Sequence, residues 1–281
     1  MNGKFERVAI VTGGARGMGR EMTLGLLGRG AAVVAADLHA EGLAELVSIA
    51  KERGHGDLLL PVQFDLSAPE SAQKVVAAAV ERFGKLDILV SNAGIGQAVM
   101  WPDDWKKPVK TWDIELHQWH TFFKVNADTH FLMTKAAIPL MLKQGWGRIV
   151  GVTTSLSSML KRGVPYGPSK AAAEALLTHL ARELDGTGIT VNILIPGGLT
   201  NTNFVPKGAP FDLSKLIQPQ VMVAPLLSLV SDEAANTTGM RFVAARWKAQ
   251  SPFADNIAAA GAPIGWSTAG SEAVRPAREE K

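Results

Sequence analysis

Short runs of apolar, mostly β-branched residues alternate with longer segments of helical spacing along most of this 281-residue chain. The apolar runs cover residues 7–12, 31–37, 58–64, 86–90, 148–153 and 188–195, with a seventh candidate at 241–245. Segments of helical spacing follow the first three, at 17–28, 41–53 and 69–83. Alternation of this kind is typical of βαβ units, and runs that are apolar throughout indicate a sheet covered on both faces. We therefore predict an α/β fold: a doubly wound parallel sheet of about seven strands with helices on both faces.

Three segments interrupt this alternation. Residues 96–118 contain three tryptophans and two prolines, residues 197–220 contain three prolines without a clean period, and residues 248–281 are rich in Ala, Gly and Pro. No internal repeat or linker separates two cores. We predict one domain over residues 1–247, with an insertion near 96–118 and a lid near 197–220, followed by a C-terminal extension at 248–281 whose last dozen residues are mobile.

The composition narrows the classes of function open to the chain. Cysteine is absent, which excludes disulfides, thiolate metal sites and a cysteine nucleophile. The 29 Lys and Arg are interspersed with 26 Asp and Glu, so the net charge of +3 gives nucleic-acid binding little support. No apolar run approaches the roughly 18 residues that cross a bilayer, and the start of the sequence lacks a signal-peptide pattern. The six histidines do not have the spacing of a metal site. We expect a cytoplasmic protein without a metal, a nucleic-acid partner or a membrane partner.

A glycine-rich turn follows the first apolar run. Residues 12–19 read TGGARGMG, and a helical segment begins within them. Such a turn lets the backbone approach a diphosphate at a helix N-terminus, although any strand-to-helix turn can use glycine. The Lys-Ser/Thr of a nucleotide-binding P-loop is replaced by residues Arg20 and Glu21. Asp37 ends the second run, where a carboxylate accepts from ribose hydroxyls and repels a 2′-phosphate, so NAD is favoured over NADP. Arg16 argues mildly for NADP.

The only tyrosine of the chain, Tyr166, stands four residues before Lys170. On a helix this spacing puts both side chains on one face. A phenol has an ordinary pKa of about 10, and a neighbouring ammonium lowers that pKa because it stabilises the phenolate. The pair therefore predicts a proton-transfer site, with an unremarkable surface pair as the alternative.

Taken together and in this order, the glycine turn, Asn92-Ala93-Gly94, Asn126 and Tyr166-x3-Lys170 resemble the short-chain dehydrogenase/reductase family, single-domain type, over residues 5–247. The resemblance implies a Rossmann fold, a nicotinamide cofactor and hydride exchange with an alcohol or carbonyl compound.

The resemblance also implies roles for individual residues. Tyr166 would be the general acid/base, Lys170 would hold the nicotinamide ribose, and Asn126 would help to hold a water on the proton path. Asn92, Ala93 and Gly94 would close the sheet edge near the cofactor, and Asp65 would meet the adenine. The full set implied for the cofactor is Gly13, Arg16, Gly17, Met18, Gly19, Asp37, Asp65, Leu66, Asn92, Ala93, Gly94, Tyr166, Lys170, Pro196, Gly197, Leu199 and Thr202.

Two departures from the family pattern stand out. The family places a serine about thirteen residues before the tyrosine, to bind the substrate oxygen, and here Thr153, Thr154 and Ser155 compete for that position. We favour Thr154, with Ser155 close behind. The stretch between Asn92 and Asn126 is also about ten residues longer than is usual in the family. Its tryptophans, Trp101, Trp105 and Trp112, either wall a substrate pocket or pack the insertion onto the protein, with packing slightly favoured.

We therefore predict an oxidoreductase that transfers a hydride between NAD(H) and a secondary alcohol or the matching ketone. The alternatives are an NADP-dependent carbonyl reductase of the same fold, a non-catalytic dinucleotide sensor and, on charge alone, a nucleic-acid-binding module. Residues 161–162, Lys-Arg, either favour an anionic substrate or form a solvated turn, and the turn is preferred. The family implies a homodimer or homotetramer, with helices at 113–142 and 165–184 as contact surfaces, and the apolar residues of these helices are equally consistent with burial inside one subunit.

Overall fold

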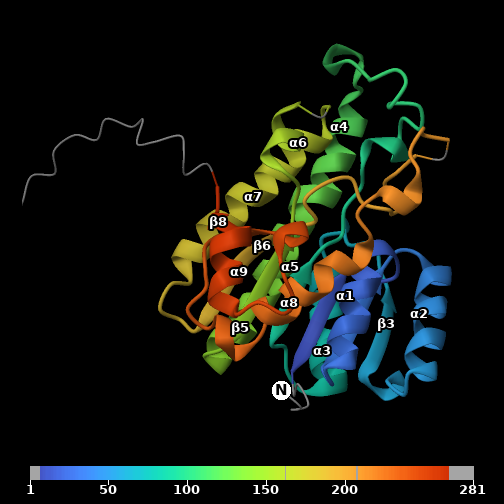
Figure 1. The fold of residues 1–281 in the computed structure, drawn as a ribbon. Helices are drawn as coiled ribbons and strands as arrows, with labels where there is room; N and C mark the ends of the chain where they lie inside the picture. The colour runs from blue at the N-terminus through green and yellow to red at the C-terminus, as the bar shows by residue number, and fades with distance from the viewer. Residues whose placement is uncertain (1–6, 162, 207, 266–281) are drawn as a thin grey trace, which may run out of the picture.

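The computed structural model describes residues 7–161, 163–206 and 208–265. Within them one mixed sheet is flanked by helices (Figure 1). Two of the predictions fall outside the described residues: the one that concerns Arg162 and the one that concerns the last dozen residues of the C-terminal extension. The strands are β1 (Val8–Thr12), β2 (Ala32–Asp37), β3 (Leu59–Gln63), β4 (Ile88–Ser91), β5 (Gly147–Val152), β6 (Ile189–Ile195), β7 (Met240–Val243) and β8 (Gly261–Pro263).

The strand order is β3-β2-β1-β4-β5-β6-β7-β8, and every pairing except the last is parallel. The predicted doubly wound parallel sheet is therefore confirmed, but the sheet has eight described strands instead of about seven. β8 comes from the C-terminal extension and pairs antiparallel with β7 over three residues. Its three-residue sequence, Gly-Ala-Pro, has no β-branched run, which is why the apolar pattern did not predict it.

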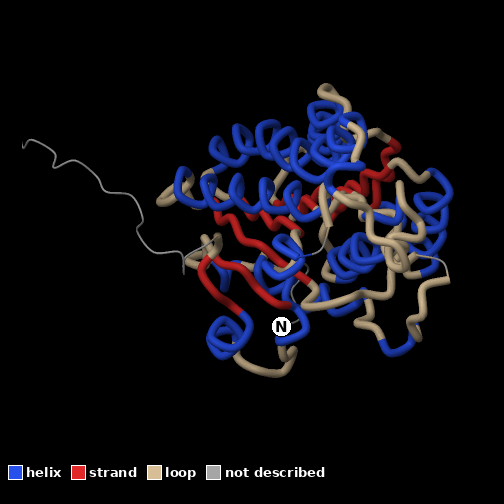
Figure 2. The backbone as a smooth tube through the Cα atoms, turned by 90° about the horizontal axis from the view of Figure 1, so that it is seen from above, coloured by secondary structure: helices blue, strands red, loops and turns tan. Residues whose placement is uncertain are grey.

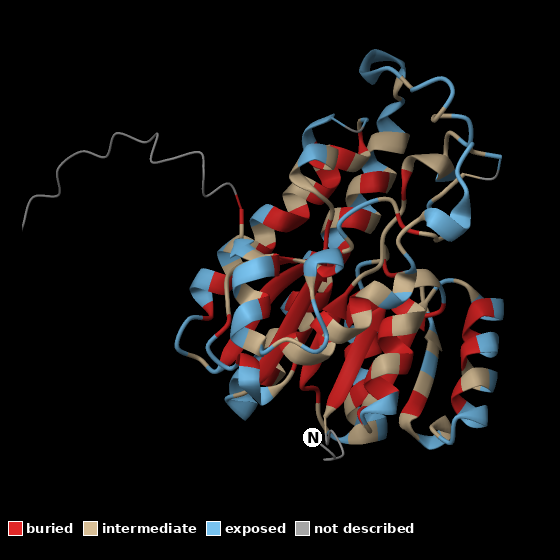
Figure 3. Cartoon of the chain, viewed as in Figure 1, coloured by how far each residue is buried: buried red, intermediate tan, exposed pale blue. Residues whose placement is uncertain are grey.

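Helices cover both faces because alternate strand residues point to opposite sides. Val11 and Val33 share one core with α1 (Gly17–Gly28), α2 (Ala40–Glu52) and α8 (Val223–Leu229). Ile10 and Val34 share the other with α3 (Ser71–Phe83), α5 (Thr129–Gln144) and α7 (Tyr166–Glu183). Figure 3 shows the resulting pattern, with buried strands at the centre and helices whose outer faces are exposed.

The helix predicted over 113–142 is interrupted. It consists of α4 (Leu116–Phe123), a π-helical turn (Lys124–Asp128) and α5. A π turn inserts one extra residue into the helical repeat, and such turns are frequent at functional sites. Three short helices of the described residues were not predicted from the sequence: α6 (Leu156–Lys161), α8 and α9 (Phe253–Ala260).

The segments predicted as an insertion (96–118) and as a lid (197–220) lie together beyond the carboxyl ends of the strands (Figures 1 and 2). The chain returns from β3 at one edge to β4 beside β1, so the direction of winding reverses between β1 and β4. In doubly wound sheets ligands bind in the crevice at this switch point. Among the described residues no helix has the length and apolar character needed to cross a membrane.

Candidate active site

The glycine turn joins β1 to α1 at the switch point. Arg16 is the N-cap of α1, and its side chain makes no capping hydrogen bond. The first turn of the helix therefore offers N–H groups that no side chain satisfies. Gly19 is needed for close packing, since a Cβ at this position would lie 1.9 Å from the carbonyl oxygen of Gly13. The turn therefore has a residue without a side chain where the start of α1 approaches the backbone of Gly13.

Asp37 lies at the end of β2, beside the glycine turn. Its Oδ2 accepts a hydrogen bond from the Ala15 N–H at 3.0 Å, and its Oδ1 accepts one from the His39 N–H at 3.0 Å. These bonds fix the carboxylate at the cavity edge and leave further lone pairs for a ligand. The exposed Arg16 lines the same cavity, and its side chain lies against α2, where a Cβ on Gly42 would be 3.0 Å from its Cγ.

The Asn92-Ala93-Gly94 segment is tied to the end of β1. The hydroxyl of Thr12 accepts from the N–H groups of Asn92 and Ala93 at 2.8 and 3.0 Å. The Asn92 amide in turn donates to the carbonyl of Thr12 at 2.9 Å and to that of Gly13 at 3.2 Å. These bonds hold the loops after β1 and β4 against each other.

Asn126 lies within the π turn and is fully buried. Its Oδ1 accepts from the Ile95 N–H at 2.8 Å, and its Nδ2 donates to the Ile95 carbonyl at 3.0 Å and to the Ser169 hydroxyl at 3.1 Å. Both amide hydrogens are thus used within the protein. A water held by Asn126, as the family resemblance implies, would have to contact its Oδ1 or its main chain, and that role stays a prediction.

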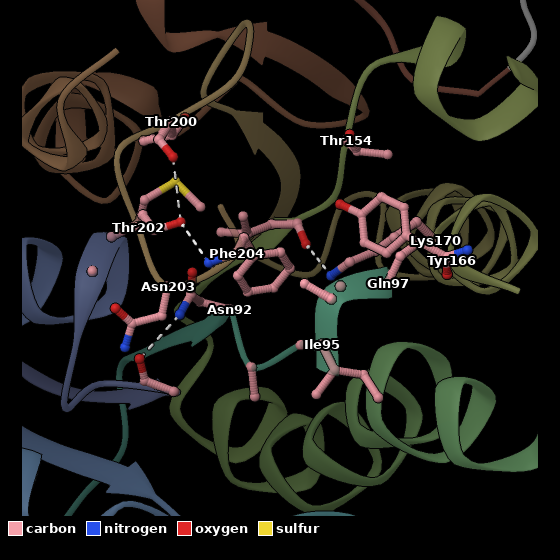
Figure 4. A pocket seen from close by; sticks show the side chains of 18 of the residues that line it. Asn92, Ile95, Gln97, Thr154, Tyr166, Lys170, Thr200, Thr202, Asn203 and Phe204 are labelled. Carbon is pink, nitrogen blue, oxygen red and sulfur yellow. Dashed lines mark hydrogen bonds between the residues drawn. The ribbon is translucent and has the colours of Figure 1, made fainter. Parts of the chain in front are cut away.

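Tyr166 and Lys170 lie on the first turns of α7. The Lys170 side chain is almost completely buried, and its Nζ donates to the Val152 carbonyl at 3.2 Å. Burial lowers the pKa of Lys170 from 10.5 to about 8, because a buried ammonium loses hydration. Figure 4 shows the Tyr166 ring beside Thr154 and Lys170, with Phe204 across from it.

The structure separates the three hydroxyls that compete for the substrate oxygen. Thr153 donates to Glu174 at 2.8 Å and is buried. Ser155 accepts from the Ser158 N–H at 3.0 Å and is hydrogen-bonded to the Ser158 hydroxyl at 2.9 Å, so it caps the start of α6. The hydroxyl of Thr154 makes no hydrogen bond to another described side chain or backbone group, and it lies beside the Tyr166 ring (Figure 4).

A cavity of about 770 Å³ connects these features. Every residue implied for the cofactor lines it, as do Tyr166, Lys170, Thr154 and Ser155, whereas the buried Asn126 does not. Residues of the segments predicted as insertion and lid line it as well, among them Trp105, Phe204 and Phe211. The other two tryptophans of the insertion are elsewhere: Trp101 stacks on Phe122 at 6.0 Å, and Trp112 is 82% exposed.

Sequence reasoning missed two neighbours of the tyrosine and lysine. The Phe204 ring lies 6.5 Å from the Tyr166 ring, edge to face, and it belongs to an aperiodic loop that gave no signal. His130 is fully buried, four residues after Asn126, and neither ring nitrogen has a hydrogen-bond partner among the described residues. Burial and, to a lesser extent, the charge of Lys170 lower its pKa to about 3, so the imidazole is neutral. The spacing of His130 from Asn126 was the one available signal.

A doubly wound sheet with a glycine turn at its switch point and a tyrosine–lysine pair in the same cavity defines a Rossmann-type oxidoreductase. Residues 7–209 match the short chain dehydrogenase family, and the chain belongs to that family. Its relatives are dehydrogenases and reductases that act on alcohol or carbonyl groups, so this chain is an enzyme of that kind.

Two relatives and one solved structure illustrate the similarity. The chain is 32% identical to L-rhamnose 1-dehydrogenase (NAD(P)(+)) of Sphingomonas sp. (strain SKA58), covering 83% of this chain and 92% of that protein. It is 29% identical to fluoren-9-ol dehydrogenase of Terrabacter sp. (strain DBF63), covering 90% and 74%. The crystal structure of gox2181 superposes with a TM-score of 0.74 at 29% identity, covering 86% and 95%.

The residues present fit the NAD(P) cofactor that the family uses. A diphosphate needs a close backbone and free N–H groups, which the glycine turn and the uncapped start of α1 provide. A ribose needs a fixed hydrogen-bonding group, and Asp37 and Lys170, which both line the cavity, are the residues that would hold the two riboses.

Proposed function

We propose that this enzyme transfers a hydride between NAD(H) and a secondary alcohol or the matching ketone. One observation carries the proposal: Tyr166, Lys170 and Thr154 line the same cavity as the glycine turn and Asp37. A reacting carbon between the tyrosine and the cofactor would be within reach of both.

The chain's own residues handle the proton and the substrate oxygen. During oxidation Tyr166 acts as a phenolate and takes the hydroxyl proton of the alcohol, and during reduction the resulting phenol returns that proton to the substrate oxygen. The Lys170 ammonium, one turn further on, stabilises the phenolate by its charge. The Thr154 hydroxyl, which has no other partner among the described residues, donates to the substrate oxygen. When bound, the nicotinamide supplies the hydride acceptor or donor.

The lid and the insertion keep water from the reacting groups. Phe204 packs on the backbone of Gly96, since a Cβ there would lie 2.7 Å from the ring. This contact closes the lid over the loop after β4, next to Tyr166. A water-poor site strengthens the electrostatic effect of Lys170 on the phenol.

Replacing Tyr166 by Phe tests the assignment of the acid/base. The wild type is assayed by NADH absorbance with a panel of fluoren-9-ol, L-rhamnose, 1-phenylethanol and cyclohexanol. We expect Tyr166→Phe to lower kcat about 10²- to 10⁴-fold, the usual contribution of a positioned acid/base. NADH binding, followed by fluorescence titration, should stay unchanged. Near-wild-type turnover would refute the role of Tyr166, and a wild type that binds NADH but oxidises nothing would favour the sensor alternative.

The choice of NAD over NADP rests on Asp37. Its carboxylate is held at the cavity edge by two backbone N–H groups and would repel a 2′-phosphate. We expect NADH to bind more tightly than NADPH. Asp37→Ala should reduce the difference between the two affinities, because the carboxylate that repels the 2′-phosphate of NADPH is removed. Arg16 is the residue that would favour the opposite order, so Arg16→Ala is the matched variant. Tighter NADPH binding by the wild type, lost in Arg16→Ala, would reverse the assignment.

A further inference from the structure

A carboxylate and a guanidinium are buried together next to the end of β5. Glu174 on α7 is 0% exposed and Arg241 on β7 is 7% exposed. The Arg241 Nε donates to Glu174 Oε1 at 2.8 Å, and its Nη2 donates to Oε2 at 3.3 Å. Neither side chain borders the cavity within the described part of the chain, so neither can touch a substrate there.

The pair is connected to the end of β5. The Thr153 hydroxyl donates to Glu174 Oε2 at 2.8 Å, and the Arg241 Nη2 donates to the Thr154 carbonyl. One residue of the β5 end is therefore held through its side chain, and the next through its backbone. Thr154 lines the cavity together with Tyr166 and is drawn near its ring in Figure 4, so the Arg241 bond to the Thr154 carbonyl holds the backbone that carries this side chain.

The same carboxylate is on the helix of the proposed acid/base. Tyr166, Lys170 and Glu174 are spaced by four residues along α7 and share one face of it. Arg241 reaches this helix from β7, next to β6 in the sheet. Three elements that are distant in the sequence thus meet at the Glu174 carboxylate. They are α7, which carries Tyr166, the end of β5, which leads to Thr154, and β7, which carries Arg241.

A buried ion pair is a poor means of stabilising a fold. Removing two charges from water is costly, and apolar side chains of the same size often stabilise a protein as well or better. Its directional bonds fix relative positions, which apolar packing does less strictly. Here those positions are the ones that the proposed reaction depends on.

We propose that Glu174 and Arg241 are positioning residues, which hold the Thr154 hydroxyl at a fixed distance from the Tyr166 phenol. The inference rests on the proposed function, in which both groups contact the substrate oxygen. We call the Glu174–Arg241 pair, with its bonds to Thr153 and Thr154, the clamp. The inference also explains why the two hydroxyls differ: the Thr153 hydroxyl bonds Glu174 of the clamp, and the Thr154 hydroxyl remains for the substrate.

Removing both charges at once tests the clamp without leaving one charge buried and unpaired. In Glu174→Leu/Arg241→Met the apolar side chains have similar size, so the melting temperature should be retained or raised. NADH affinity should stay within about threefold of wild type, because the glycine turn is untouched. We expect kcat for the fastest alcohol of the panel to fall about 10- to 100-fold, with KM changed less than about threefold, as for a misplaced reacting group. A folded double variant with wild-type kcat would overturn the inference.

A second series covers the case in which the double variant does not fold. Thr153→Val removes only the hydroxyl that bonds Glu174, and Thr153→Ser keeps it. We expect kcat to fall severalfold in the valine variant and to recover in the serine variant. Thr190→Val is the matched control, since this buried threonine of β6 has a hydroxyl without a partner among the described residues. Equal kcat values in all three variants would refute the clamp.

The two proposals fail differently. A wild type that shows no turnover on the panel removes the proposed function and, with it, this inference. A wild type that turns over, and whose kcat depends on Tyr166 but not on the Glu174–Arg241 pair, overturns the inference alone.

Discussion

Single side chains in this protein carry their chemistry because of where they are buried. Lys170 is a charged residue with 3% of its surface exposed, and within the described part of the chain its ammonium makes one hydrogen bond, to the Val152 carbonyl. The ammonium is useful to the proposed reaction, because it stabilises a phenolate, but its burial costs stability. A site that places such a group in the interior reduces the stability of the free protein to gain function.

The cost at Lys170 predicts a pH dependence of stability. The pKa of Lys170 is 10.5 when exposed and about 8 in the folded protein. Below pH 8 both states carry the proton, so the full penalty is present. Between pH 8 and 10.5 the folded state has lost the proton while the unfolded state keeps it, so the free energy of unfolding rises.

Lys170→Met should remove this rise. We expect the cofactor-free variant to be more stable at pH 7 by up to about 3 kcal/mol, from 1.36 kcal/mol per pKa unit, and the gain to shrink towards pH 10. Urea unfolding at pH 7, 8.5 and 10 measures it. Lys143→Met, an exposed lysine of α5, is the control for the loss of a charge. A variant whose advantage is the same at all three pH values would contradict the explanation.

At the scale of elements, the start of α1 shows how a helix and a turn make one binding feature. Gly19 and Gly28 belong to the same helix, but they have different surroundings. A Cβ at Gly19 would collide with the Gly13 backbone, whereas a Cβ at Gly28 would meet nothing within 4 Å. Of these two positions, only Gly19 must be a glycine for the packing.

This contrast predicts opposite effects of the same substitution. Gly19→Ala should weaken NADH binding at least tenfold, because the turn must open to admit the methyl group and the N–H groups of α1 are displaced. Gly28→Ala should leave binding unchanged and stabilise the protein by up to about 1 kcal/mol, the helix propensity of alanine over glycine. Fluorescence titration and thermal unfolding provide the two readouts. Equal NADH affinity in both variants would mean that the turn does not hold the diphosphate.

At the scale of the whole molecule, the outer face of α4 and α5 leaves apolar side chains in water. Leu116 is 69% exposed, Phe131 49% and Leu142 46%. The family resemblance expects a homodimer or homotetramer with these helices at the contact, and exposed apolar residues on adjoining helices suit such a contact.

Light scattering tests this expectation. We expect the wild type to be a dimer or tetramer and Phe131→Asp to dissociate it, because a buried carboxylate at the contact is costly. Leu213→Asp, at an equally exposed position on the lid, should keep the wild-type mass. A monomeric wild type would rule the contact out, and dissociation by both variants would place the contact elsewhere.

Local patterns in the chain determined much of this protein. The alternation of apolar runs predicted seven of the eight described strands, and short motifs predicted the family and the residues around the cavity. Both succeed because their physical causes are local. A strand or helix buries residues at a fixed period, and a turn or an i,i+4 pair is made by residues a few positions apart.

The tertiary structure decided what depends on contacts between distant residues. The partners of Thr153 and Ser155 decide that Thr154 is the hydroxyl left without a partner among the described residues. The Arg241–Glu174 bond joins residues 67 positions apart. The π turn at Asn126 and the burial of His130 likewise follow from packing against other elements. Periodicity and residue spacing do not predict such contacts, because the contacts form only when the folded sheet brings its strand ends together.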